Sequence, residues 1–349
     1  MRILITGNMG YIGSFLVIYL RKTFPEAELI GFDSAFFGHC LTNVSVLPES
    51  FLDRQIFADV RDLSSSLLVG VDAVVHLAAI SNDPMGNEFV TVTEDINRRA
   101  SVRLAKLSAR AGVKNFVFAS SCSIYGYAEG EARKENHPTK PLTPYARSKI
   151  DTEADLANAD LDGMVFTSLR LATACGMSDR LRLDLVLNDF VASAVTLGEI
   201  TVLSDGTPWR PLIDVEDIAR SISWAIQRSA ENGGSFLCVN VGRDEINYQI
   251  KDLAEAVAQH VPGTQVNINM NALTDKRSYK VDFSLFKSLA PDFAPQVSLA
   301  ESIERMYAGL LQMKFTDRNF RDSPLVRLNT LRQHIFANRL GTDLRWKRA

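Results

Sequence analysis

The feature that most constrains the fold is a set of three glycines directly after a short apolar run at the N-terminus. The run at residues 2–6 (RILIT) is typical of a buried parallel strand, and residues 11–20 have helical character. Glycines between a strand and a helix permit a tight turn and let the backbone approach a pyrophosphate, which the helix N-terminus attracts. We therefore predict a dinucleotide site here. Its expected residues are Gly7, Gly10, Tyr11, Ile12 and Gly13.

The second predicted strand, at residues 28–32, ends in Asp33. An acid at about this distance from the glycines hydrogen-bonds the adenosine ribose in dinucleotide-binding folds. Because a carboxylate would repel a 2′-phosphate and no arginine follows it directly, we expect NAD in preference to NADP. Later strand ends should meet the same cofactor, and the residues expected there are Asp59, Val60, Leu77, Ala78 and Ala79. His76, inside the apolar run before the last three, is interpreted as a packed core residue.

The composition narrows the possible classes of function. With 349 residues, 46% of them hydrophobic, and a net charge of −3, the chain can bury a large core and has no electrostatic reason to bind nucleic acid or a membrane surface. No apolar run reaches membrane-spanning length, and the N-terminus leads into a strand without a signal peptide. The four scattered cysteines have neither metal-site nor disulfide spacing, so we expect no metal and a reduced, cytoplasmic setting.

Strand and helix patterns alternate from residue 1 to about 170, as a doubly wound parallel α/β sheet of the Rossmann type requires. Beyond residue 175 the pattern is less regular, and helices are expected near residues 182–197, 214–229 and 246–260. This part should form a smaller lobe over the carboxyl ends of the strands, where α/β proteins bind ligands. The predicted units are an NAD-binding domain at 1–175, a mainly substrate-binding lobe at 176–313 and a basic tail at 314–349.

The basic tail differs from the rest of the chain in charge, with nine Lys or Arg against three Asp. Leu325, Leu328, Leu331 and Ile335 recur in it at helical spacing. We interpret the tail as an amphipathic helix packed on the protein's own acidic body or on a neighbouring subunit, in preference to a nucleic-acid-binding segment.

Tyr145 and Lys149 are the candidate chemical pair. They lie four residues apart on a predicted helix, so both side chains project from one face. The ammonium can lower the pKa of the phenol and can hold the nicotinamide ribose. A tyrosine tuned towards neutrality can take a proton from a substrate hydroxyl as hydride leaves for NAD, and return it in the reverse step. A hydroxyl from the Ser-rich end of a preceding strand should be the third member, with Ser121 favoured over Ser123.

Together these motifs resemble the extended short-chain dehydrogenase/reductases, and within them the nucleotide-sugar epimerase/dehydratase group. The motifs that carry the resemblance are Gly7-x-x-Gly10-x-x-Gly13, His76-Leu77-Ala78-Ala79, Ser121-Cys122-Ser123-Ile124-Tyr125-Gly126, Tyr145-x-x-x-Lys149 and Leu169-Arg170. The resemblance covers roughly residues 1–310. It implies tightly held NAD, a Ser/Tyr/Lys triad and a nucleoside-diphosphate sugar bound between the lobes. It also implies a homodimer formed through the helices near 86–110 and 144–159.

Three substrate-binding residues are assigned from the resemblance. Arg210, in the segment at 209–217 (WRPLIDVED), resembles the arginine with which the family grips the substrate diphosphate. Arg277 looks like a second phosphate arginine, and a guanidinium suits this role because it meets phosphate oxygens in a bidentate fork. Asn188 stands where the family often has an asparagine near the diphosphate.

Departures from the family pattern narrow the expected reaction. Sugar 4,6-dehydratases carry an acidic pair where this chain has Cys122 and Ser123, so the resemblance disfavours dehydration. We therefore expect an NAD-dependent nucleotide-sugar epimerase that acts at C4 through a transient 4-keto sugar. A net 4-dehydrogenase or 4-ketoreductase that uses NAD or NADP would need the same triad. A non-catalytic NAD-binding scaffold is the third alternative, against which the intact Tyr/Lys pair and the strand-end serine argue.

Overall fold

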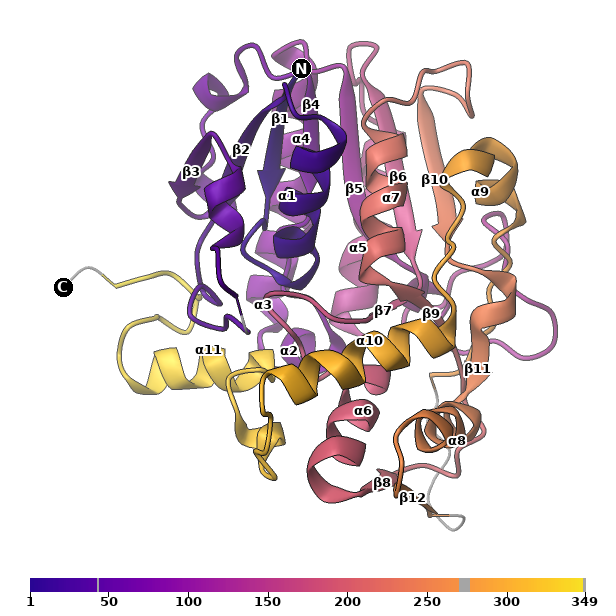
Figure 1. Ribbon diagram of the computed structural model, residues 1–349. Coiled ribbons are helices and arrows are strands. Elements are labelled where there is room, and N and C mark those ends of the chain that lie inside the picture. The colour runs from indigo at the N-terminus through magenta and orange to yellow at the C-terminus, as the bar shows by residue number, and fades with distance from the viewer. Residues whose placement is uncertain (43, 270–276, 348–349) are drawn as a thin grey trace.

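A computed structural model describes residues 1–42, 44–269 and 277–347, and a seven-stranded sheet lies at its centre (Figure 1). The strand order is β10-β6-β5-β4-β1-β2-β3, and every neighbouring pair is parallel. The strands are β1 (Arg2–Thr6), β2 (Glu28–Asp33), β3 (Arg54–Phe57), β4 (Ala73–His76), β5 (Asn115–Ser121), β6 (Val165–Leu171) and β10 (Phe236–Val241). The order reverses between β1 and β4, which places a ligand crevice at their carboxyl ends. The predicted doubly wound Rossmann fold is confirmed.

Helices cover both faces of this sheet, and the first strand shows why its residues are apolar throughout. Ile3 and Ile5 pack in the core layer that α1 (Tyr11–Thr23) and α7 (Val215–Ala225) share, whereas Leu4 packs in the layer below α4 (Ser101–Arg110) and α5 (Pro144–Ala157). Alternate side chains therefore serve opposite faces, and neither face is left for polar residues. The remaining helices of the second layer are α2 (Asp83–Glu88), α3 (Val90–Thr93) and η4 (Glu94–Ala100).

His76 confirms its interpretation as a core residue, because it is buried and both ring nitrogens have hydroxyl partners. Nδ1 lies 2.6 Å from Thr6 Oγ1, and Nε2 lies 2.7 Å from Ser101 Oγ. Burial lowers the pKa of His76 to about 3. The imidazole is therefore neutral at physiological pH and joins the sheet to α4.

The second half of the chain builds smaller sheets beside the carboxyl ends of the large one. A three-stranded sheet contains β7 (Thr173–Cys175), β9 (Trp209–Asp214) and β11 (Asn247–Gln249), and a two-stranded sheet contains β8 (Glu199–Val202) and β12 (Gln265–Ile268). The chain also returns to the large sheet at β10, so residues beyond 175 contribute to both parts. The helices are α6 (Val186–Leu197), α8 (Ile250–His260), α9 (Ser284–Leu289) and α10 (Leu299–Gln312). Helix α6 begins four residues later than expected, because residues 178–185 run as an irregular segment.

The C-terminal segment packs on the body of the same chain, on the side of the molecule that holds β2 and β3 (Figure 1). It contains α11 (Arg327–Phe336), and Leu331, Leu340 and Leu344 are at most 1% exposed in the core layer below α4 and α5. The amphipathic helix predicted for the tail is therefore present. Arg348 of the basic set, and Asp275 and Lys276 beside Arg277, lie outside the described residues.

Within residues 1–42, 44–269 and 277–347, every helix falls short of the length and apolar character that a bilayer-spanning helix needs.

Candidate functional site

A cavity of about 940 Å³ opens at the carboxyl ends of the strands and brings the two sequence motifs together. The glycine loop lines one part of it, and Tyr145 and Lys149 line another. The sequence-predicted residues that line it are Gly7, Gly10, Tyr11, Ile12, Gly13, Asp33, Asp59, Val60, Leu77, Ala78, Ala79, Ser121, Ser123, Tyr145, Lys149, Arg210 and Arg277. Gly13 and Tyr145, which are 132 positions apart in the sequence, thus share one volume of the size of a cofactor pocket.

The glycine loop has the shape that a dinucleotide needs. Gly7 has φ of +78°, and a Cβ there would lie 2.6 Å from the backbone nitrogen of Ala78. A Cβ on Gly13 would lie 2.4 Å from the carbonyl oxygen of Gly7, so this glycine lets α1 approach the loop. Helix α1 then begins at Tyr11 with its first amides unbonded within the helix and facing the cavity end. These residues fit the pyrophosphate of NAD.

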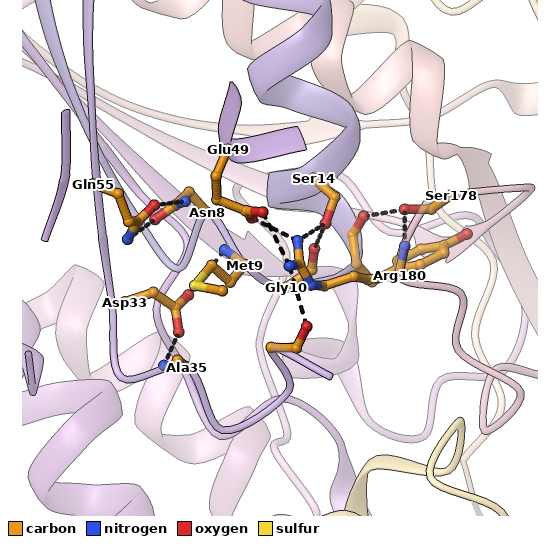
Figure 2. A network of polar contacts seen from close by, with 12 residues as sticks. Asn8, Met9, Gly10, Ser14, Asp33, Ala35, Glu49, Gln55, Ser178 and Arg180 are labelled. Atoms are coloured by element: carbon orange, nitrogen blue, oxygen red, sulfur yellow. Dashed lines mark hydrogen bonds and ion pairs between the residues drawn. The ribbon is translucent and has the colours of Figure 1, made fainter. Parts of the chain in front are cut away.

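Asp33 holds the glycine loop in place as well as lining the cavity. Its carboxylate accepts a hydrogen bond from the Met9 amide at 3.0 Å and another from the Ala35 amide at 2.7 Å (Figure 2). Burial raises the pKa of Asp33, and these two amide donors oppose that rise. The residue expected to bind the adenosine ribose is therefore tied to the loop expected to bind the pyrophosphate.

The start of α1 is braced from the segment between β7 and α6. The Arg180 guanidinium is 2.6 Å from Glu49 Oε1 and donates to Ser14 Oγ at 3.2 Å, and Ser178 Oγ donates to the Tyr11 carbonyl at 2.7 Å (Figure 2). Arg180 is 1% exposed, so this ion pair is inside the protein. The second half of the chain therefore helps to position the helix N-terminus.

Tyr145 and Lys149 take their geometry from the first turns of α5. Pro144 is the first residue of the helix, and the Thr143 hydroxyl caps it by accepting from the Ala146 amide at 3.2 Å. Lys149 donates from Nζ to the Ala119 carbonyl at 2.6 Å, and Nζ lies 5.8 Å from the centre of the Tyr145 ring. The phenol and the ammonium therefore face the same part of the cavity, at the end of β5.

The charges around the Tyr145 phenol differ from the sequence expectation. Burial raises the pKa of Tyr145 to about 12, while a hydrogen bond with Ser121 and the charge of Arg182 lower it. Burial also lowers the pKa of Lys149 to about 7, well below that of the phenol. A guanidinium keeps its proton throughout the physiological pH range, so Arg182 is a permanent positive charge that favours the phenolate.

Arg182 is a site residue that the sequence interpretation missed. It lines the cavity, donates to Asp184 Oδ1 at 2.9 Å and Oδ2 at 2.8 Å, and donates from Nη1 to Ser81 Oγ at 2.9 Å. Asn82 holds the same carboxylate at 2.7 Å. The sequence offered one signal for Arg182, which is that two charged residues interrupt an otherwise apolar run at 181–187. The expected helix from residue 182 hid this signal, because charged residues are ordinary on a helix surface.

Asp83 is a second missed residue, and it contacts one of the predicted phosphate arginines. Its carboxylate accepts from Arg277 Nη1 at 2.9 Å and from the Thr143 hydroxyl at 2.6 Å. Arg210 donates to the carbonyl of Arg277, and its guanidinium carbon lies 5.9 Å from the centre of the Tyr279 ring. The two arginines assigned from the resemblance are therefore adjacent, and Asp83 links them to the start of α5.

Asn188 does not face the cavity, in contrast to the sequence expectation. It is fully buried on α6, where its amide accepts from the Gly176 amide at 3.1 Å and donates to the Arg182 carbonyl at 2.9 Å. A third bond of 3.4 Å reaches the Tyr11 hydroxyl. The side-chain amide thus holds these segments together, and Asn188 is not among the residues that line the cavity.

The two candidate serines are placed differently at the end of β5. The Ser121 hydroxyl accepts from the Ser123 amide at 3.1 Å, and its effect on the Tyr145 phenol is to lower the pKa. Ser123 also lines the cavity, and its buried hydroxyl has no hydrogen-bond partner among the described residues. Cys122 between them points away, because its Sγ is buried and donates to the Arg170 carbonyl at 3.1 Å. Both serines can therefore meet a ligand, whereas Cys122 cannot.

Comparison with known proteins agrees with this geometry. Residues 3–242 match the model of the NAD dependent epimerase/dehydratase family. An uncharacterised UDP-glucose epimerase of Bacillus subtilis is 31% identical over 257 residues, which cover 70% of this chain and 78% of that protein. A UDP-glucose 4-epimerase of Lactobacillus helveticus is 30% identical over 237 residues, 62% of this chain and 69% of that protein.

The fold also agrees with solved structures. That of MoeE5 in complex with UDP-glucose and NAD has a TM-score of 0.74 at 24% identity, over 89% of this chain and 99% of the other. The similarity extends beyond the Rossmann sheet to most of the described chain. The chain therefore belongs to the NAD dependent epimerase/dehydratase family, as an enzyme of the short-chain dehydrogenase/reductase type whose cofactor is NAD.

Proposed function

We propose that the protein is a nucleotide-sugar epimerase that inverts C4. The observation that carries the proposal is the placement of Tyr145, which lies one helical turn from Lys149 and shares a cavity with Ser121 and the glycine loop. An acid/base group beside a dinucleotide site is what reversible oxidation of a sugar hydroxyl requires. The relatives named UDP-glucose 4-epimerase support the same position on the sugar.

The residues of this chain would divide the work as follows. Tyr145 would accept the proton of the C4 hydroxyl and return it after the 4-keto sugar has turned over in the cavity. Ser121, or Ser123 with its unpartnered hydroxyl, would hydrogen-bond the reacting oxygen. Lys149, which lies on α5 beside the end of β5, would hold the nicotinamide ribose. NAD, when bound, supplies the hydride chemistry that these groups serve.

Binding would be shared between the two ends of the cavity. Gly7, Gly10 and Gly13 would admit the pyrophosphate of NAD, with Tyr11 and Ile12 at the helix start, and Asp33 would bind the adenosine ribose. The other contributors at this end would be Asp59, Val60, Leu77, Ala78 and Ala79. Arg210 and Arg277 would bind the diphosphate of the nucleotide sugar. This division assigns the region at 1–175 mainly to NAD and the region at 176–313 mainly to the substrate.

A net 4-dehydrogenase or 4-ketoreductase would use the same groups, and the fate of the 4-keto sugar separates the two reactions. Native protein incubated with a panel of nucleotide sugars should yield C4-inverted products without added cofactor. A requirement for stoichiometric NAD(H), or release of a 4-keto product, would favour the alternative. Absence of both bound nucleotide and turnover would favour a scaffold.

Tyr145→Phe is the decisive variant. Removal of the hydroxyl deletes the proton acceptor but keeps the ring, so turnover should fall about 10²- to 10⁴-fold while the NAD content stays that of the wild type. Turnover is measured by product analysis, and NAD by mass spectrometry of the denatured protein. Tyr127→Phe, at a 43%-exposed tyrosine outside the cavity, is the matched control and should be fully active. Full activity of Tyr145→Phe would reject the mechanism.

We also propose a homodimer formed by the outer faces of η4, α4 and α5. These helices pack side by side and carry charges of both signs, such as Arg98, which lies 2.8 Å from Asp155 and 3.8 Å from Asp151. Mixed charges can pair across a twofold axis, because each copy presents both partners. Light scattering after size exclusion should give twice the monomer mass. The four free cysteines suit a reduced cytoplasmic setting, in which the enzyme would serve carbohydrate biosynthesis.

A further inference from the structure

The basic tail is the sequence feature that the proposed activity leaves without a role. It lies beyond the residues that match the family model, which end at 242. The structure places it against the end of the cavity that Asp33 and Asp59 line, and α11 even contributes Arg327 to the cavity lining. Many contacts of this segment therefore bear on the cofactor end of the site.

The loop that follows Asp33 needs support from outside itself. Residues 34–42 contain neither helix nor strand, and Ala35 has φ of +58°. Asp33, Ser34, Phe36 and Phe37 nevertheless line the cavity. A loop without its own hydrogen-bond ladder keeps a defined shape only when neighbouring elements hold it.

The tail supplies that support on the outer side of the loop. The Trp346 indole donates from Nε1 to the Ser34 carbonyl at 2.5 Å, and its ring centre lies 5.8 Å from that of Phe36. His334 on α11 contacts both Phe36 and Trp346. Its Nε2 lies 2.9 Å from the Phe36 carbonyl, and its ring centre lies 4.9 Å from that of Trp346. The Arg327 guanidinium lies 5.0 Å from the centre of the Phe37 ring.

The opposite wall of the same end is tied to the tail through two arginines. Arg61 pairs with Asp59 at 2.5 Å, and its Nη1 donates to the Asp343 carbonyl at 2.9 Å. A second ion pair joins Arg345 to Asp62 at 2.5 Å. The tail therefore joins the two walls, because it holds the loop after β2 and the turn after β3 at once.

We propose that the segment from Arg327 to Lys347 forms the outer wall of the adenosine half of the NAD site and sets how tightly that half is held. This inference rests on the proposed function, since it takes the cavity end at Asp33 and Asp59 as the adenosine site. Trp346, His334 and Arg61 act as positioning residues, because they touch the walls and not the cofactor. The nicotinamide half, at Tyr145 and Lys149, is independent of them.

The test compares the affinities of the full-length protein for AMP, for nicotinamide mononucleotide and for NAD by calorimetry. Trp346→Ala should weaken AMP and NAD about tenfold, through loss of one hydrogen bond and one aromatic contact, and leave nicotinamide mononucleotide unchanged. Trp346→Phe keeps a ring but not the donor, and should weaken AMP about threefold. Phe336→Ala, at a 93%-exposed aromatic of the same segment, is the matched control and should change nothing.

Thermal unfolding of each variant shows that the fold is intact. Wild-type affinity of Trp346→Ala for AMP would overturn the proposal, as would an equal loss of AMP and nicotinamide mononucleotide, which would mean a general loosening. If the wild type itself binds neither mononucleotide nor NAD, the cofactor assignment fails and this inference fails with it. Wild-type binding with an unaffected Trp346 variant would overturn the inference about the tail alone.

Discussion

The two ends of the cavity are held in different ways. At the cofactor end, close contacts between backbone segments hold the glycine loop, since a Cβ on Gly7 or Gly13 would meet backbone atoms at 2.4 to 2.9 Å. At the substrate end, paired side chains form the lining. Arg182 pairs with Asp184 in its own segment, and Arg277 pairs with the distant Asp83.

This difference predicts different responses to change. Close backbone contacts cannot yield without moving a strand or a helix, so substitutions in the glycine loop should have all-or-none effects on the cofactor end. Ion pairs exchange partners, so a ligand's charges can replace one member of a pair at the substrate end. Substitutions there should shift a pKa or an affinity by a graded amount.

The largest effect is expected from Gly7→Ala. The new methyl would combine a φ of +78° with a 2.6 Å approach to the Ala78 backbone, so we expect loss of bound NAD and a stability decrease of about 2–3 kcal/mol. Gly112 has nearly the same φ, +79°, but a Cβ there would meet no atom within 4 Å. Gly112→Ala therefore measures the cost of backbone strain without a steric clash. It should cost about 1 kcal/mol and retain NAD. NAD content and denaturant unfolding measure both, and an NAD-replete Gly7→Ala protein would contradict the rigid cofactor end.

An intermediate effect is expected from Arg182→Gln. A positive charge stabilises the phenolate, so its removal should raise the pKa of Tyr145 and reduce the ionised fraction at any pH below it. The acidic limb of the kcat profile should move up by roughly one pH unit, with about a tenfold loss at neutral pH that higher pH restores. Arg182→Lys keeps the charge and should remain near the wild-type profile.

A matched control lies two residues away, since Arg180→Gln breaks a buried ion pair with Glu49 outside the cavity. It should lower the unfolding temperature without moving the acidic limb. Titration of the phenol by its ultraviolet absorbance, with and without Tyr145→Phe, gives the same pKa without turnover. A profile of Arg182→Gln that keeps the wild-type limb would refute Arg182 as the source of the charge.

The smallest effect is expected from Asp83→Asn. The amide keeps the acceptor for Thr143 but loses the charge that holds Arg277, a side chain 45% exposed in this pair. With less competition from Asp83, the KM for the nucleotide sugar should fall about two- to threefold. Because Asp83 also raises the pKa of Tyr145, the acidic limb should move down, opposite to Arg182→Gln. The control is Glu88→Gln, because Glu88 lies on the same helix as Asp83 and pairs with Arg332 of α11. Loss of this pair should leave KM unchanged.

Residues within one motif could be assigned from the sequence. The three glycines, Asp33 and the Tyr145/Lys149 pair act through local geometry, either a strand–turn–helix unit or one turn of a helix, and local geometry follows from spacing along the chain. The family, the Rossmann sheet and the cofactor followed from these few positions. The start of α6 was harder to predict from the sequence, because an irregular segment with apolar residues has the same pattern as the first turn of a helix.

The charge balance at Tyr145, the inward turn of Asn188 and the place of the tail were decided by the tertiary structure. Arg182 is 37 residues from the phenol it affects, and Trp346 is 312 residues from its partner Ser34. No periodicity in the sequence encodes which of several arginines or aromatics reaches such a partner, because that depends on how separate elements pack. The sequence alone determined the chemistry this protein can hold, and the packing decided which charges tune it and what encloses it.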